Sequence, residues 1–79
     1  MDYTPKEKAT ITHLSALLFT KEEIEILMND NYGNTFEEMQ TKGVLQGKYE
    51  IRKNLYADAK RGEKKAVAQW MILTNYLAL

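Results

Sequence analysis

Apolar side chains recur every three or four residues through most of the chain, which is the spacing that places them along one face of an α-helix. Such stripes occupy residues 5–18, 21–28, 36–61 and 64–77. No segment alternates between apolar and polar residues for long enough to predict a β-strand. The pattern therefore predicts a single all-α domain over residues 1–79, with a short second helix, a long third helix and a fourth helix that folds back.

The starts of three of these helices carry the same four-residue pattern, Thr-x-x-Glu, at residues 4–7, 20–23 and 35–38. In a capping box of this kind, the threonine hydroxyl accepts from the backbone of the glutamate, and the glutamate carboxylate accepts from the backbone of the threonine. The first pattern contains proline at the first helical position, where no amide hydrogen is needed. Phe19 and Ile24 flank the second start at the spacing of a hydrophobic staple. These patterns predict where the first three helices begin.

The third helix has a stripe of small and apolar residues that we expect to face inward: Phe36, Met39, Gly43, Gly47, Ile51, Leu55 and Ala59. Each glycine of this stripe costs about 1 kcal/mol relative to alanine in a helix interior. The pair predicts either a kink near Gly43 or a place where another backbone approaches closely. Gly62 stands where a left-handed residue commonly ends a helix, so we predict the turn between the third and fourth helices there.

The predicted hydrophobic core combines one stripe from each helix. Its members are Ile11, Leu14, Leu17, Leu18, Ile24, Leu27, Phe36, Met39, Ile51, Leu55, Ala59, Val67, Trp70 and Met71. A chain of 79 residues without cysteine has a small core and no disulfide to reinforce it. The C-terminal segment ILTNYLAL carries more apolar residues than one short chain is expected to bury. We therefore predict a homo-oligomer that associates through its last two helices.

The formal net charge of zero is unevenly divided along the chain. Residues 1–40 hold three lysines and eight acids, a net charge of −5, whereas residues 41–79 hold eight lysines or arginines and three acids, a net charge of +5. Two explanations are head-to-tail packing, within one chain or between subunits, and a basic face that binds phosphate. The longest apolar runs, residues 70–73 among them, are too short to cross a bilayer, and the first ten residues do not resemble a secretion signal. We expect an intracellular protein with no membrane partner.

Candidate catalytic and metal-binding residues are few. His13 is the only histidine, and no motif supplies it with a nucleophile or an orienting carboxylate. The acids of residues 22–25 are spread around a helix, and the segment NDNYGN lacks the twelve-residue pattern of a calcium loop. No phosphate-binding glycine motif is present. The sequence therefore predicts a protein that is not an enzyme and that holds no metal or cofactor.

The segment FTKEEIEILMNDNYGNTFEEM, residues 19–39, reads as a helix-turn-helix. With the glycine of the long helix and the later segment LYADAKRGEKKAVAQWM, it is similar to bacteriophage small terminase-like helix-turn-helix proteins. The matching residues are Thr20, Glu22, Glu23, Ile24, Thr35, Phe36, Gly47, Leu55, Tyr56, Ala59, Gly62, Ala66 and Trp70. The resemblance covers roughly residues 18–77. It implies a DNA-packaging accessory protein in the cytoplasm of a bacterial host cell, which forms rings and passes double-stranded DNA to an ATP-driven large terminase subunit.

The second helix of this motif departs from the pattern of a DNA-reading helix. Its first turn carries Glu37 and Glu38, which would repel phosphates. We therefore expect DNA contacts from the cations that follow, which are Lys42, Arg52, Lys53, Lys60, Arg61, Lys64 and Lys65. The alternative is that these cations cover only the solvated faces of helices. In that case the protein is a helical oligomeric adaptor with no nucleic-acid role.

Overall fold

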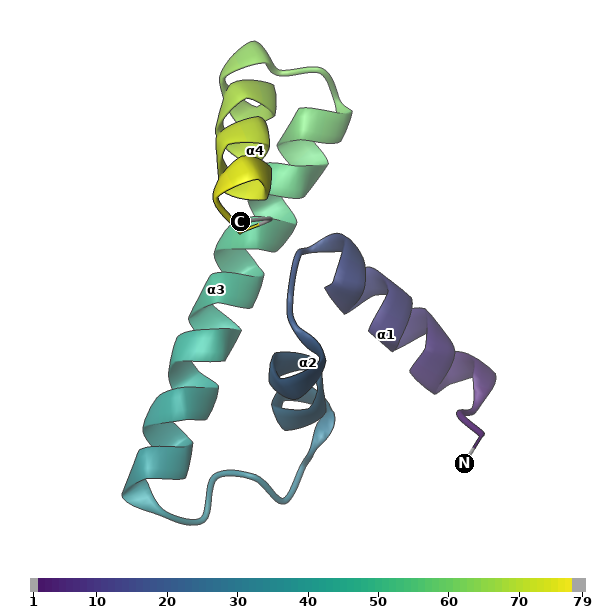
Figure 1. Cartoon of the computed structure of the whole chain (residues 1–79), viewed down its shortest axis with the longest axis vertical. Helices are drawn as coiled ribbons and strands as arrows, with labels where there is room; N and C mark the ends of the chain where they lie inside the picture. The colour runs from purple at the N-terminus through teal and green to yellow at the C-terminus, as the bar shows by residue number, and fades with distance from the viewer. Residues whose placement is uncertain (1, 78–79) are drawn as a thin grey trace.

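The computed structural model describes residues 2–77, and the secondary structure over that range is entirely helical. Its elements are α1 (Pro5–Ala16), α2 (Lys21–Met28), α3 (Phe36–Lys60) and α4 (Lys64–Leu77). Figure 1 shows α3 as the long axis of the molecule. α4 folds back along the C-terminal half of α3, and α2 lies between α1 and the N-terminal half of α3. The predicted four-helix fold is confirmed. Among the helix bounds, the end of α1 differs most from the prediction, because residues 17–18 form the turn that closes this helix.

The capping boxes of α1 and α2 are formed as predicted. Thr4 Oγ1 accepts from the backbone N–H of Glu7 at 3.1 Å, and Glu7 Oε1 accepts from that of Thr4 at 2.9 Å. Thr20 and Glu23 repeat the arrangement at 3.2 and 2.9 Å. The bond from the Thr4 amide holds the pKa of the Glu7 carboxyl below its usual value, because it stabilises the charged form.

The third predicted box, at the start of α3, is only half formed. Thr35 Oγ1 accepts from the backbone N–H of Glu38 at 3.1 Å. The Glu38 carboxylate accepts from the amides of Gly33 at 3.2 Å and Asn34 at 3.1 Å. These two bonds stabilise the charged carboxylate and so lower the pKa of Glu38, with the larger effect from the Gly33 amide. Glu38 therefore fastens the loop between α2 and α3 to the first turn of α3.

Gly62 ends α3 in the predicted left-handed conformation, with φ of 86°. Its N–H donates to Ala59 O at 3.0 Å, and the N–H of Glu63 donates to Asp58 O at 3.2 Å. This pair of bonds is a Schellman motif, which satisfies the last carbonyls of a helix. The chain can then reverse direction within a few residues and enter α4.

The same motif ends α1, but with leucine in the glycine position. Leu18 has φ of 71°, its N–H donates to Ser15 O at 3.0 Å, and the N–H of Phe19 donates to Leu14 O at 3.2 Å. A left-handed residue with a side chain costs roughly 1–2 kcal/mol. The turn therefore needs support from elsewhere in the fold, and Arg52 of α3 supplies it, as described below.

The core lies where α1, α2 and α3 meet. Its buried residues are Leu14, Leu17, Phe19, Ile24 and Leu45. Leu17 is completely inaccessible. Three of the five were predicted as core from their stripes, and Phe19 is buried beside Ile24 as the staple predicts. Leu45 was not predicted, because it lies on the side of α3 that the sequence suggested would face solvent.

The predicted inward face of α3 is wrong over its first four turns. Phe36, Met39 and Ile51 are 68, 54 and 70% exposed, whereas Leu45 and Arg52 are buried. The core-facing stripe steps through Leu45, Tyr49, Arg52 and Tyr56, on the opposite side of the helix from Phe36. This stripe looks polar in the sequence, but aromatic rings and the stem of an arginine fill space as apolar groups do.

The glycines of α3 also behave differently from the prediction of a kink. The helix continues through Gly43 and Gly47 without a break. Added Cβ atoms at these positions would meet nothing within 4 Å, so no other part of the described chain approaches them closely. Neither glycine is therefore explained by packing within the described part of the chain.

α4 packs on α3 through one face only. Tyr56 and Trp70 form an edge-to-face pair with ring centroids 5.0 Å apart, and Ala66 is buried. The opposite face of α4 is open: Met71, predicted as core, is 60% exposed, and Ile72 is 68% exposed. None of the described helices combines the length and the apolar character that crossing a bilayer requires.

Candidate nucleic-acid interface

The seven cations predicted to contact DNA have different environments. Lys42 folds back against the end of α2, where its Nζ donates to Asn29 O at 2.7 Å and to Tyr32 O at 3.2 Å. These carbonyls follow the last turn of α2, where a positive charge is favourable. The side chain of Lys42 therefore holds the α2–α3 loop in place and does not project from the surface.

Arg52 is buried and points into the fold. It is 8% exposed, and its Nη1 donates to Leu17 O at 3.3 Å and to Leu18 O at 3.4 Å. The guanidinium carbon lies 4.6 Å from the centroid of the Phe19 ring, within the range of a cation–π contact. Arg52 thus caps the end of α1 from α3, and it supports the turn that holds Leu18 in its left-handed conformation. It is a structural residue in this fold and cannot reach a phosphate.

Lys53, the next residue along, is half-buried and partly neutralised. Its Nζ lies 3.4 Å from Glu50 Oε2 and 5.2 Å from the centroid of the Tyr49 ring. Tyr49 in turn places its hydroxyl 3.2 Å from Nε2 of His13, so the single histidine packs α1 against α3. These contacts belong to the surface of the helical core, away from the end of the molecule where the remaining cations gather.

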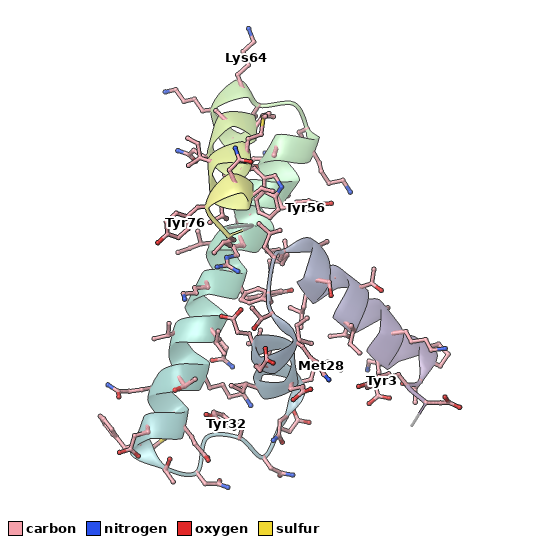
Figure 2. The ribbon with its side chains drawn as sticks, viewed as in Figure 1. Tyr3, Met28, Tyr32, Tyr56, Lys64 and Tyr76 are labelled. Carbon is pink, nitrogen blue, oxygen red and sulfur yellow. The ribbon has the colours of Figure 1, made fainter. Side chains whose placement is uncertain are left out.

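The remaining four cations lie together at the turn between α3 and α4, which we call the basic tip: Lys60, Arg61, Lys64 and Lys65. All four are exposed, and Figure 2 shows Lys64 projecting from the extreme end of the molecule. Arg61 pairs with Asp58 and, at 3.5 Å, with Glu63. Four cations against these two carboxylates leave the tip with a net charge of +2.

Lys64 and Lys65 are the most available of these cations. Neither forms an ion pair with another of residues 2–77. The Nζ of Lys60 lies 5.4 Å from the centroid of the Tyr56 ring, on the side of the tip that faces the body of α3. The tip can therefore present three ammonium groups, those of Lys60, Lys64 and Lys65, to an anionic surface.

The start of α3, where a recognition helix of a helix-turn-helix would meet DNA, has a different character. Glu37 is exposed there, and Glu38 is occupied by its bonds to Gly33 and Asn34. Phe36 is largely exposed beside them. The only cation in the next turn is Lys42, which bonds to carbonyls of the preceding loop. This end of α3 offers carboxylate and apolar surface, which does not suit phosphate contact.

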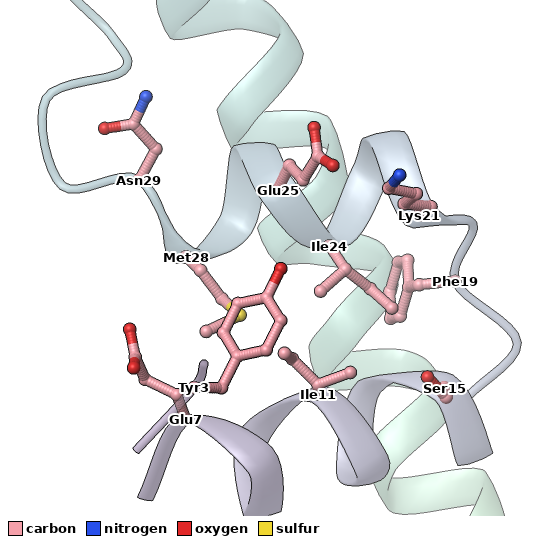
Figure 3. Close-up of a pocket in the computed structure, with 10 residues that line it drawn as sticks. All are labelled: Tyr3, Glu7, Ile11, Ser15, Phe19, Lys21, Ile24, Glu25, Met28 and Asn29. Carbon is pink, nitrogen blue, oxygen red and sulfur yellow. The ribbon is translucent and has the colours of Figure 1, made fainter. Parts of the chain in front are cut away.

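A hollow between α1 and α2 is another surface feature with a defined lining. Figure 3 shows Tyr3, Ile11, Ile24 and Met28 around it, with Glu7 at its edge. The Glu7 carboxylate already serves the cap of α1. The hollow therefore presents mainly apolar surface, and no group of three metal-ligating side chains occurs among the described residues.

Comparisons with known proteins give no further guide. A scan against protein-family models, a search of curated proteins and a search of solved structures each returned no match to this chain. The functional argument therefore rests on the residues and their arrangement.

Proposed function

We propose that the chain is a non-enzymatic, small terminase-like DNA-packaging accessory protein that binds double-stranded DNA through its basic tip. The tip is the one observation that carries this proposal, because it gathers four exposed cations, Lys60, Arg61, Lys64 and Lys65, at one end of the molecule. In the proposed role the protein acts as a homo-oligomer in the cytoplasm of a bacterial host cell. A large terminase-like protein is its partner, as the resemblance implies.

The mode of binding differs from that of a typical helix-turn-helix. Lys42 and Arg52 are committed to backbone carbonyls inside the fold, and the first turn of α3 exposes Glu37. Contacts from lysines at the tip reach phosphates and carry no base sequence. We therefore expect the isolated protein to bind double-stranded DNA weakly and with little sequence preference, and to gain affinity from several tips in an oligomer.

A salt titration of DNA binding tests the proposal. If the three free ammonium groups of a tip each neutralise one phosphate, the logarithm of the binding constant falls with the logarithm of salt concentration with a slope of about −3 per tip. The double variant Lys64→Glu/Lys65→Glu should weaken binding to all sequences alike and flatten the slope. Glutamates in the first turn of α4 suit the helix dipole, so this variant should fold.

The matched control is Lys6→Glu/Lys8→Glu, which makes the same change of net charge on exposed positions of α1. Glu37→Gln adds a second control, because removal of a carboxylate from the start of α3 should leave binding equal or slightly stronger. If the tip variant and the α1 variant lower the affinity equally, only net charge matters and the assignment of the tip is wrong.

A second function, that of a helical adaptor without a nucleic-acid role, is favoured by a different observation. Large apolar side chains are exposed on both helices of the C-terminal hairpin, with Val44 at 58% and Tyr76 at 74% among them. Such surfaces are typical of protein–protein contact. The adaptor function predicts no measurable affinity for DNA at physiological salt in the wild-type protein, whatever its oligomeric state.

A further inference from the structure

The side of α3 that faces away from the core carries large apolar side chains and two glycines, with the exposed polar residues Gln40 and Glu50 among them. We call this side the outer face of α3, and its apolar and small residues are Phe36, Met39, Gly43, Val44, Gly47 and Ile51. Its four large side chains are all more than half exposed. Figure 1 shows α1 and α2 on the other side of the N-terminal half of α3, and no described helix covers this one. From Phe36 to Ile51 the surface runs about 22 Å along the helix.

We propose that the outer face of α3 is where a second copy of this chain binds, with the two α3 helices antiparallel. The glycines provide the first argument for a helix as the occupant. Gly43 and Gly47 lie on adjacent turns, and the space around both is empty to 4 Å. Positions without a Cβ allow another helix backbone to come close. That use explains two glycines for which the single chain gives no reason.

The arrangement of residues along α3 fits a two-fold axis level with Leu45. Gly43 and Gly47 stand two residues on either side of that level, and Met39 and Ile51 stand six residues on either side. In an antiparallel pair, Gly43 of each copy is then level with Gly47 of the other, and Met39 is level with Ile51. The small residues meet at the centre and the large ones meet on both flanks, as the self-complementary interface of a two-fold dimer requires.

Net charge favours the antiparallel direction. Residues 1–40 carry a net charge of −5, and residues 41–79 carry a net charge of +5. An antiparallel pair therefore places the acidic start of each α3 level with the basic second half of the other, whereas a parallel pair would place like charges level with each other.

The proposal is independent of DNA binding, because it uses none of the residues of the basic tip. In the antiparallel pair the two tips project beyond the overlapping region at opposite ends. Loss of DNA binding in a Lys64→Glu/Lys65→Glu protein that still dimerises would overturn neither proposal, whereas a monomeric protein that binds DNA would overturn this one alone.

Sedimentation equilibrium of the full chain is the first test. We expect a dimer at high micromolar concentration, and we expect Ile51→Glu to weaken it by at least about tenfold, because a charge would enter an apolar contact. Gln69→Glu, an equal charge change on an exposed position of α4, should leave association unchanged. A monomer, or a dimer equally stable in both variants, would overturn the proposal.

The glycines allow a test in which two effects have opposite signs. In the monomer, Gly43→Ala/Gly47→Ala should raise the urea midpoint, because alanine favours the helix. In the dimer, the added methyl groups should push the helices apart and weaken association by at least about tenfold. Stronger association of the double-alanine protein would show that the helices do not meet at the glycines.

Disulfide cross-linking tests the direction, because the chain has no cysteine of its own. In the antiparallel dimer, Met39→Cys should link to Ile51→Cys when the two variants are mixed. Met39→Cys alone should not link, because its two copies lie about 18 Å apart along the helix axis. Efficient linking of Met39→Cys to itself would indicate a parallel pair and overturn the proposal.

Discussion

The sequence predicts that Arg52 contacts DNA, whereas the structure shows that its side chain caps the end of α1. Replacement of Arg52 by methionine tests which of these two roles the residue has. Methionine keeps the apolar stem and removes the guanidinium group. In the wild type that group donates to Leu17 O and Leu18 O and lies over the ring of Phe19. The substitution therefore removes the cap of α1 and the support of its left-handed turn, while it changes the volume of the core very little.

The magnitude follows from these contacts. A hydrogen bond from a charged group contributes about 1.5–3 kcal/mol, and the two bonds of 3.3 and 3.4 Å are long, so the lower end applies. A desolvated cation–π contact adds about 1–2 kcal/mol. Part of this loss of stability is offset, because the methionine side chain also contacts the Phe19 ring and brings no charge into the core. We expect Arg52→Met to lower the free energy of unfolding by about 2 kcal/mol, from a total of roughly 4–12 kcal/mol for a chain of this length.

Urea denaturation followed by circular dichroism measures this change. The matched control is Lys53→Met, whose partly exposed ion pair with Glu50 should be worth less than about 0.5 kcal/mol. Hydrogen exchange adds a local readout, because α1 amides should exchange faster in Arg52→Met while α4 amides keep the protection of the α3–α4 contact. Should Arg52→Met keep the wild-type midpoint and lose DNA affinity, the residue contacts DNA and the capping role is wrong.

Further predictions concern two glycines and the carboxylates of two helix caps. Gly62→Ala should lower the free energy of unfolding by about 1 kcal/mol, because φ of 86° strains any residue with a side chain. Gly47→Ala should raise the free energy of unfolding of the monomer by about the same amount, because alanine favours a helix interior and nothing lies near this position. Urea denaturation measures both changes. The pKa values of Glu7 and Glu38 are lowered in the folded state, so these carboxylates stabilise the fold above their ordinary pKa of 4.5 and cease to do so as the pH falls through the lowered values. The urea midpoint should fall below about pH 5, and it should fall less steeply in Glu7→Gln/Glu38→Gln.

The helix boundaries were predictable because their causes are local. Each Thr-x-x-Glu box acts across three residues, and Gly62 acts within one turn, so the sequence contains the whole interaction. The box of Glu38 is only half formed, because its carboxylate accepts from the amides of Gly33 and Asn34, which are five and four residues away, and not from that of Thr35. Leu18 could not be predicted as a left-handed residue, since its support comes from a side chain 34 residues away.

The register of α3 was not predictable for a different reason. The helix carries two stripes that could both be buried, one of small and apolar residues and one of Leu45, Tyr49, Arg52 and Tyr56. Hydropathy favours the first stripe, whereas α1 and α2 pack on the second. The environment of the candidate cations was not predictable either, because a sequence shows which residues are charged but not which backbone carbonyls they bond to. Arg52 and Lys42 therefore read as surface cations.

The two stripes of α3 have a common physical explanation if the helix is buried on both sides. A helix that meets its own core through one face and a second copy through the opposite face needs apolar or space-filling residues on both. The inner face tolerates arginine because Arg52 donates to two backbone carbonyls there, whereas the outer face holds glycines and exposed apolar side chains in its middle turns. The hydropathy pattern then reports burial in the assembly, and the exposed 70% of Ile51 in the single chain is the surface that the partner covers.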